Sequence, residues 1–451
     1  MEQGHSTTET ATAPTAVQVG GWGVWIYSCV TLLTEERMRR ADKWRVRVGL
    51  FVLAGTALMV IAGCAGGKRE PIFGTVASSP ERAARGYAAG LRVATYEVFW
   101  DRLQPVRDRC DESKFDQARQ DIAAFRDAGL EVVLSLGVQY PPAWAFEVPN
   151  SRYVNQYGEA YVDGEPGANG LNAVFNQEVR DLQADYIARA FQELGDDFYA
   201  VRLGWGYYGE LSYPSHTHND RPNAYWGFDD VALGRAGNLA NTLSPNPVPD
   251  WKPGDPSPDH GAARQFAAWY LDAMTDYQNW QIETVRQHYG GRLAVLYPSW
   301  GLRPGQLDAA VDKDLSGFTA PELNGEIQRG HDFSRHVAGL PDPEVRTSGV
   351  VVYTTWLDAS PAFGDDGGQD PVGWSPVHFL AALAEDRGSA LEVWGENTGW
   401  GSVEAMALCF DRLDAYDVSG LFWAFEEQLF EQGDYARLDD YAALIAARAD
   451  D

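Results

Sequence analysis

The segment Val201-Arg-Leu-Gly-Trp-Gly-Tyr-Tyr-Gly-Glu-Leu-Ser-Tyr-Pro-Ser215 changes character near its middle. Residues 198–203 are apolar or β-favouring, which predicts a strand. The chain then passes through glycines and aromatic residues and places one carboxylate, Glu210, just beyond that strand. Aromatic rings around one acid suit a sugar, because apolar ring faces stack on aromatics and burial raises the pKa of the carboxyl. A core strand followed by a turn with a solvated glutamate explains the same pattern.

A second acid has similar neighbours. In Leu391-Glu-Val-Trp-Gly-Glu-Asn-Thr-Gly-Trp400, Glu396 follows a short apolar run and lies between two Trp residues. The repetition favours a functional pair of carboxyls over two unrelated turns. We therefore predict that Glu210 and Glu396 are catalytic.

Short apolar runs and amphipathic helices alternate along the rest of the chain, which predicts βα units and a parallel sheet. Eight such units within residues 81–451 predict an α/β fold, the (β/α)8 TIM barrel. On this count Glu210 ends the fourth strand and Glu396 the seventh, both at the C-terminal face where barrel enzymes carry their chemistry. The predicted strands lie near residues 91, 131, 153, 199, 292, 350, 391 and 419, the third of them weak, and the main predicted helices span 115–125, 178–194, 262–288, 375–387, 402–415 and 434–447.

The composition is that of a soluble globular protein, with 45% hydrophobic and 22% charged residues, and it is rich in aromatic residues, with 16 Trp and 21 Tyr. The net charge of −28 argues against nucleic acid and anionic membrane surfaces as partners and fits a neutral substrate. The sequence has no Gly-rich phosphate loop and no nucleophilic Ser elbow, so we expect no cofactor. The four cysteines match no zinc pattern, and we interpret His216-Thr-His218 as part of a polar loop and not as a metal site.

The N-terminal region has the features of a targeting sequence. Residues 38–47 are basic, and an apolar run over residues 48–63 leads to Ala-Gly-Cys64, which resembles the bacterial lipobox, in which the cysteine is lipidated. A single membrane-anchoring helix is the alternative, but the run is short for a span of ~20 residues. We therefore predict a mis-called extension or disordered segment over 1–37, a lipoprotein signal over 38–63, a tether over 64–80 and a catalytic barrel over 81–451. The mature protein is then expected outside the cytoplasm, in contact with the bacterial cell membrane only through a lipid on Cys64.

The first predicted units resemble the clan of glycoside hydrolases that includes the family 42 β-galactosidases. The similarity is carried by Val98-Phe-Trp-Asp-Arg-Leu-Gln-Pro105, by the helix after it, and by Gly129-Leu-Glu-Val-Val-Leu134 and Pro141-Pro-Ala-Trp144. That clan has catalytic glutamates after strands four and seven, which the resemblance transfers to Glu210 and Glu396. This chain has Gly209 where the clan has Asn before the first of these acids.

The neighbours of both acids resemble instead the family 14 β-amylases. Gly209-Glu-Leu-Ser-Tyr-Pro-Ser215 is similar to their Gly-Glu-Leu-Arg-Tyr-Pro-Ser motif, which carries the general acid. Gly395-Glu-Asn397 matches their Gly-Glu-Asn motif, which carries the general base, and Glu97-Val-Phe-Trp100 lies where they have Asp-Val-Trp-Trp, whose acid binds a sugar hydroxyl. The resemblance implies that Glu210 is the acid, Glu396 the base and Glu97 a sugar ligand.

The other candidates for substrate contact lie at or near predicted strand ends. Each Trp among them suits a core position as well as a sugar subsite, but their clustering on one face favours a sugar cleft. Glu322, Glu326 and Glu427 are rival acids that we rank below the pair. The candidates are Trp100, Gln139, Tyr140, Trp144, Trp205, Tyr208, Trp300, Trp356, Trp394, Asn397, Trp400, Trp423 and Glu426.

Two classes of function follow from these residues. The first is a glycoside hydrolase that cleaves O-glycosidic bonds of an oligo- or polysaccharide, and the second is a surface lipoprotein that binds glycans without catalysis, since a fold alone does not imply activity. The presence of both acids favours the enzyme. The clan retains the anomeric configuration with carboxyls about 5–5.5 Å apart, whereas inverting enzymes need about 6.5–9.5 Å. The residues next to the acids favour inversion, with Glu396 as a base.

Overall fold

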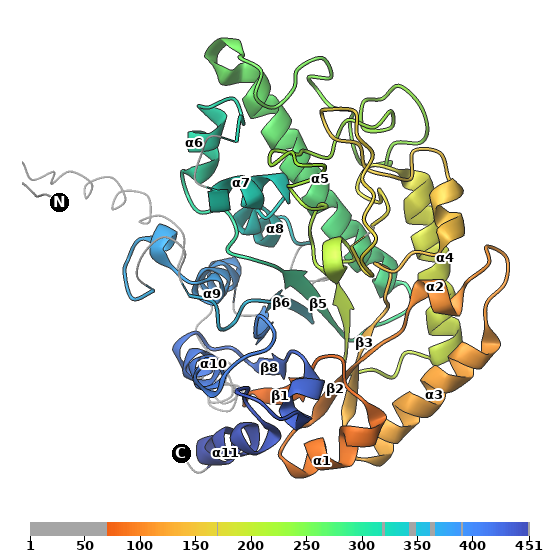
Figure 1. Cartoon of the computed structure of the whole chain (residues 1–451), viewed down its shortest axis with the longest axis vertical. Helices are drawn as coiled ribbons and strands as arrows, with labels where there is room; N and C mark the ends of the chain where they lie inside the picture. Colours follow the sequence, from red (N-terminus) through yellow and green to blue (C-terminus); the bar gives the residue numbers. More distant parts are fainter. Residues whose placement is uncertain are drawn as a thin grey trace, which may run out of the picture. The chain divides into compact units, whose positions relative to one another are not determined.

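Eight parallel strands pair in chain order and close into a barrel, because β1 also pairs with β8 (Figure 1). The closing register runs from Ile72 opposite Gly420 to Thr75 opposite Trp423. The predicted α/β barrel is therefore confirmed. The strands are β1 (Ile72–Thr75), β2 (Val93–Glu97), β3 (Glu131–Ser135), β4 (Ala200–Leu203), β5 (Arg292–Tyr297), β6 (Val350–Thr354), β7 (Glu392–Glu396) and β8 (Gly420–Trp423).

Successive residues of each strand point to opposite sides of the barrel wall. In β6, Val350 and Val352 belong to the apolar layer shared with the helices, whereas Val351 and Tyr353 belong to a separate cluster formed by all eight strand regions. That second cluster fills the barrel interior. The site at the barrel mouth therefore rests on a packed apolar floor.

Helices follow the strands and surround them (Figure 1). Helix α3 packs against β3, α9 against β6 and β7, and α10 against β8. The 26-residue helix α5 buries Phe266, Tyr270 and Tyr277, as its apolar pattern predicts. The helices are α1 (Ala83–Ala88), α2 (Trp100–Leu103), α3 (Glu112–Asp127), α4 (Gln177–Leu194), α5 (Gly261–Arg286), α6 (Gln306–Val311), α7 (Pro321–Gln328), α8 (Phe333–Ala338), α9 (Pro376–Arg387), α10 (Val403–Ala415) and α11 (Leu438–Ala449).

The computed structural model describes residues 70–449 except 169, 318–320, 342–348, 361–365 and 389–390. All of these residues belong to the unit Gly67–Asp451. The segments 1–37 and 38–63 and the residue Cys64, on which the targeting predictions rest, lie outside the described residues. Within the described residues, no helix has the length and apolar character needed to span a bilayer.

Two expectations about the strands are wrong. Strand β1 lies within residues 64–80, which the sequence predicts to be a tether, and the weak strand predicted near residue 153 is only an isolated bridge between Val154 and Ala160. The sequence pattern thus misses β1 and predicts an additional strand near residue 153. Because both errors precede β4, the strands before Glu210 and at Glu396 are still the fourth and the seventh. Strand β1 escapes notice because it has four residues and contains Gly74, where a Cβ would lie 2.7 Å from the carbonyl oxygen of Val93.

Candidate active site

A cavity of about 300 Å³ opens at the barrel mouth. Residues at or near the C-terminal ends of all eight strands line it. Glu210, just beyond β4, and Glu396, the last residue of β7, both face this cavity, and so does Glu97 at the end of β2. The barrel therefore brings three carboxyl groups from separate parts of the sequence to one site.

A tight turn after β4 presents Glu210. The backbone N–H of Trp205 donates to the Gly209 carbonyl at 3.1 Å, and the N–H of Gly206 donates to the Glu210 carbonyl at 2.9 Å. The turn leaves no room for side chains at its glycines, because a Cβ on Gly206 would lie 2.1 Å from the Ser212 carbonyl oxygen. This close approach accounts for the alternation of glycine and aromatic residues in the sequence.

Two features of the turn favour Gly209. Its φ of +85° lies in the left-handed region that favours glycine, and a Cβ there would lie 2.9 Å from Nε2 of Gln139. A side chain at this position would therefore require the Gln139 amide, which donates to Glu97, to move.

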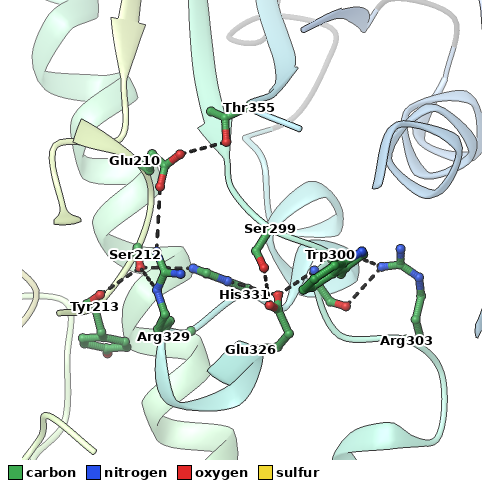
Figure 2. A network of polar contacts seen from close by, with 12 residues as sticks. Glu210, Ser212, Tyr213, Ser299, Trp300, Arg303, Glu326, Arg329, His331 and Thr355 are labelled. Atoms are coloured by element: carbon green, nitrogen blue, oxygen red, sulfur yellow. Dashed lines mark hydrogen bonds and ion pairs between the residues drawn. The ribbon is translucent and has the colours of Figure 1, made fainter. Parts of the chain in front are cut away.

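The carboxyl group of Glu210 has few polar partners. Its side chain is 19% exposed, Oε1 accepts a hydrogen bond from the Thr355 hydroxyl at 2.8 Å, and Oε2 lies 3.8 Å from Nη2 of Arg329 (Figure 2). Burial, with a smaller contribution from the charge of Glu396, raises the pKa of Glu210 to about 7 against the opposing effects of Arg329 and Thr355. A carboxyl group with this pKa holds its proton for a large part of the time at neutral pH, as a proton donor must.

The carboxyl group of Glu396 is held more firmly. Nη2 of Arg202 donates to its Oε2 at 2.9 Å, and the Tyr353 hydroxyl donates to the same oxygen at 2.7 Å. Burial raises the pKa of Glu396 above its usual value, but Arg202 and Tyr353 act in the opposite direction. Because both contacts use Oε2, Oε1 is the oxygen left to meet a substrate or a water molecule.

Glu97, the last residue of β2, is the third carboxyl group at the cavity. It accepts hydrogen bonds from Ser135 at 2.9 Å, from Nε2 of Gln139 at 2.8 Å and from the Tyr140 hydroxyl at 3.3 Å. Among the described residues, the buried atoms Thr95 Oγ1, Gln139 Oε1 and Arg202 Nε in the cavity wall have no hydrogen-bond partner. Buried polar atoms are normally paired, so this wall suits a ligand that carries hydroxyl groups.

Several predicted site residues line the cavity. The indole of Trp205 lies beneath its wall, and Tyr208 is 52% exposed at its mouth. The amide of Asn397 is engaged elsewhere, since it donates to the carbonyl of Ala424 at 2.8 Å and accepts from the N–H of the same residue at 2.6 Å. Asn397 thus ties the end of β7 to the end of β8. The predicted residues in the lining are Glu97, Gln139, Tyr140, Trp205, Tyr208, Glu210, Trp356, Glu396 and Asn397.

Three predicted sugar-binding Trp residues are core residues instead. Trp100 is fully buried against Tyr186, with 5.2 Å between ring centroids, and Trp394 and Trp423 are also buried. Trp394 belongs to the cluster inside the barrel, whereas Trp423 belongs to the layer beneath the helices. Indoles at these depths have no surface to offer a substrate, so their predicted role does not agree with the structure.

The remaining predicted contacts lie outside the cavity lining. Trp144 donates to the Gln104 carbonyl, Trp300 packs edge-to-face on Trp356, and Trp400 packs on Tyr435. Glu426, which we predicted to contact the substrate, is instead a buried structural residue. It is 3% exposed and accepts hydrogen bonds from the Thr75 hydroxyl and the Ser79 N–H, so it joins β8 to the segment after β1 and does not face a sugar.

Four polar residues of the site were not among the residues predicted from the sequence. Arg202 had a detectable signal, because a lone cation within an apolar strand needs a buried partner. Tyr353, Thr355 and Arg329 had none, since a Tyr or Thr suits any strand and Arg329 follows α7, a helix that was not predicted from the sequence. Phe425 is a further residue of the lining and is 41% exposed.

Comparisons with known proteins support the architecture. The sequence matches no family model and no curated protein. Among solved structures, the catalytic domain of β-amylase from Paenibacillus polymyxa is similar, with a TM-score of 0.58 and 13% identity over 85% of this chain and 99% of that one. β-Galactosidases from Marinomonas ef1 and Halorubrum lacusprofundi have TM-scores of 0.51 and 0.50 and identities of 12% and 15%, each over 84% of this chain.

These likenesses establish the fold. The chain has a TIM barrel like those of the β-amylase and the two β-galactosidases, as the sequence resemblance predicts. It spans 59% and 57% of the two β-galactosidase chains but nearly the whole β-amylase domain.

Proposed function

We propose that this protein is a glycoside hydrolase that uses Glu210 as general acid and Glu396 as general base. One observation carries the proposal. Two mostly buried carboxyl groups face one cavity at the barrel mouth in contrasting environments, Glu210 with a pKa of about 7 and Glu396 held by Arg202 and Tyr353. Carboxyl pairs with separated environments are the usual acid and base of glycoside hydrolysis.

The chemistry follows from these two environments. Glu210 transfers its proton to the glycosidic oxygen as the bond from that oxygen to the anomeric carbon breaks. Glu396 accepts a proton from a water molecule whose oxygen forms the new bond to the anomeric carbon. The leaving sugar departs as an alcohol, and exchange with solvent returns both carboxyl groups to their starting states. Arg202 keeps Glu396 oriented through Oε2 during this sequence.

We expect the substrate to be a neutral oligo- or polysaccharide. Glu97 has carboxylate oxygens at the cavity that match sugar hydroxyl groups, and the aromatic rings of Tyr208 and Trp356 suit apolar sugar faces. The net charge of −28 opposes an anionic polymer.

A substrate screen tests the proposal. The purified protein is assayed against aryl glycosides and polysaccharides, and binding to the same polysaccharides is measured in parallel. Hydrolysis of at least one substrate, lost in a Glu210→Gln variant that still binds it, supports the enzyme. Binding without hydrolysis by the wild type supports the alternative, a glycan-binding protein on a barrel scaffold.

The activity of the enzyme should depend on pH in a bell-shaped way. Glu210 must be protonated, so kcat/KM is expected to fall as the pH rises through about 7. Glu396 must be ionised, so kcat/KM should also fall as the pH drops through the raised pKa of that group. Initial rates at low substrate concentration from pH 4 to 10 measure both limbs. An alkaline limb that persists in Glu210→Gln with an activated substrate would contradict the assignment.

We further propose that the mature protein is anchored to the outer side of the cytoplasmic membrane by lipid on Cys64. The support is the basic and apolar segment over residues 38–63 and the Ala-Gly-Cys ending. One acyl chain binds a membrane only marginally, whereas the several chains of a bacterial lipoprotein hold it firmly.

Replacing Cys64 by Ser is expected to move the protein from the membrane fraction to the soluble fraction. Fractionation of expressing cells and labelling with a radioactive fatty acid measure this change. Cys110→Ser is the matched control, since it removes a free thiol of the barrel and should leave the protein with the membrane. Wild-type protein that takes up no fatty acid and stays in the cytoplasm would show the proposal to be wrong.

A further inference from the structure

A polar network, most of it buried, connects Glu210 with Arg329, Ser212, His331 and Glu326 (Figure 2). Arg329 lies beside Glu210, and its Nε donates to the hydroxyl oxygen of Ser212 at 3.2 Å. The same oxygen lies 3.1 Å from Nε2 of His331, whose Nδ1 lies 3.1 Å from Oε2 of Glu326. Ser212, His331 and Glu326 are 3%, 0% and 4% exposed. None of these three residues lines the cavity, so the mechanism above does not use them directly.

Beyond His331 the network reaches a buried carboxylate, that of Glu326 (Figure 2). The N–H of Gly301 donates to Oε2 of Glu326 at 2.6 Å, and the hydroxyl of Ser299 donates to Oε1. Burial alone would raise the pKa of Glu326, but His331, Ser299 and Arg329 outweigh it and lower the pKa below its usual value. Glu326 is therefore an anion that attracts hydrogen-bond donors toward it.

The middle of the network has a preferred direction. Burial lowers the pKa of His331 against the opposing charge of Glu326, and the charge of Arg329 lowers it further, which favours the neutral imidazole at pH 7. A neutral imidazole that donates from Nδ1 to Glu326 accepts at Nε2, and the Ser212 hydroxyl is the donor within reach. That hydroxyl also lies 2.8 Å from the Tyr213 carbonyl, a second acceptor. Whether the Ser212 hydroxyl donates to His331 or to the Tyr213 carbonyl, its oxygen accepts a hydrogen bond from Nε of Arg329. This hydrogen bond holds the guanidinium in place.

The backbone around Arg329 is also held. Its carbonyl accepts from the N–H of Tyr213 at 2.9 Å, and its N–H donates to the Gly325 carbonyl at 3.0 Å. The guanidinium also lies over the ring of Tyr207, 5.4 Å from the centroid. These contacts join the end of α7 to the turn that carries Glu210.

We propose that Arg329 is a positioning residue for Glu210, and that the chain of Ser212, His331 and Glu326 holds its guanidinium in place. Glu210 faces charged or polar groups from four elements: Arg202 of β4, Thr355 after β6, Glu396 of β7 and Arg329 after α7. Of the two cations, Arg202 is committed to Glu396 at 2.9 Å. Arg329 is thus the cation available to limit how strongly Glu210 binds its proton. The catalytic consequence rests on the proposed function, but the effect on Glu210 does not.

The test measures the titration of Glu210 in the absence of substrate. Full-length protein is labelled with 13C at the glutamate side-chain carboxyl groups, and the Glu210 resonance is assigned by its loss in Glu210→Gln. Arg329→Gln is expected to raise the pKa of Glu210, because a favourable positive charge is removed. Arg329→Lys keeps the charge and should titrate close to the wild type. Arg335→Gln is the matched control, since Arg335 pairs with Asp332 and Asp272 and is not among the groups that act on Glu210.

Ser212→Ala tests the holding chain. Without the hydroxyl, Arg329 loses its anchor while its charge remains, so the pKa of Glu210 should move in the same direction as in Arg329→Gln but by less. In active protein, the alkaline limb of kcat/KM should shift together with the pKa of Glu210 measured by NMR. At a pH well above that pKa, each unit by which the pKa is raised should increase kcat/KM by about tenfold, because the protonated fraction of Glu210 rises by that factor.

Two results would overturn the inference. If the Glu210 resonance in folded Arg329→Gln titrates as in the wild type, Arg329 does not act on Glu210. If Ser212→Ala titrates as in the wild type, the chain does not hold Arg329. Failure of the proposed function is a different result, because protein that hydrolyses no glycoside still gives the NMR titration. An active enzyme whose Glu210 is insensitive to Arg329 refutes this inference alone.

Discussion

Replacing Glu210 by Gln should lower kcat/KM by roughly 10²–10⁴-fold on substrates with poor leaving groups, which is the usual contribution of general acid catalysis. The amide is nearly isosteric with the carboxyl group, so the Thr355 hydrogen bond at the barrel mouth can be kept. The loss should shrink for aryl glycosides with activated leaving groups, because these depart without protonation. Initial rates on a series of aryl glycosides of graded leaving-group pKa measure the dependence.

Two controls separate chemistry from folding. Glu427→Gln makes the same substitution at an exposed glutamate after β8 and should leave rates unchanged. The melting temperature of Glu210→Gln at pH 8 should equal or exceed that of the wild type. The pKa of Glu210 in the folded protein, about 7, lies above the usual value for glutamate. Ionisation of Glu210 therefore lowers the stability of the wild-type protein as the pH rises through about 7, and the Glu210→Gln variant does not undergo this loss. Wild-type rates on every substrate would show that Glu210 is not the acid.

The barrel could be predicted because most of its strands coincide with short runs of apolar residues in the sequence. The strands predicted near residues 292, 350, 391 and 419 are β5 to β8, which begin within a residue or so of these positions. Strand β1 could not be predicted, because four residues that include Gly74 form no detectable period. It is stabilised by pairing with β2 and β8, the second of which lies more than three hundred residues away, and no local pattern records that contact.

The acids of the site could be predicted because they follow strands, whereas their partners could not. Arg202 and Glu396 are 194 residues apart in the sequence, and Thr355 and Glu210 are 145 apart. Only closure of the barrel brings these side chains together. The sequence shows which residues end strands, but not which ones meet across the mouth.

The Trp residues show a second limit, which is depth. Trp394 and Glu396 lie two residues apart on β7 and point to the same side of the sheet, yet Trp394 is one layer deeper and packs on Phe422 inside the barrel, with 5.3 Å between centroids. Trp423 is on the opposite face from Phe422 and lies under α11 beside Tyr441. A Trp near a strand end reaches the site only if its side chain points into the barrel and lies in the layer next to the mouth.

Replacing Glu396 by Gln should reduce activity by at least 10²-fold, and by a similar factor for every leaving group. The reason differs from that for Glu210. Activation of the attacking water does not depend on the leaving group, so a better leaving group cannot compensate for a missing base. Rates on the same aryl glycoside series distinguish the two patterns. Glu392→Gln, at the other end of β7, is the matched control and should retain wild-type rates.

The stereochemistry of the product decides how Glu396 acts. We expect inversion, because the residues beside both acids resemble those of the β-amylase type, in which the second acid is a general base. A base needs space for one water molecule between its carboxyl group and the anomeric carbon, which corresponds to carboxyl groups about 6.5–9.5 Å apart. Proton NMR of the first-formed anomer, recorded before mutarotation, shows the outcome. A covalent glycosyl adduct on Glu396, trapped with a fluorinated glycoside, would instead make Glu396 a nucleophile and the enzyme a retaining one.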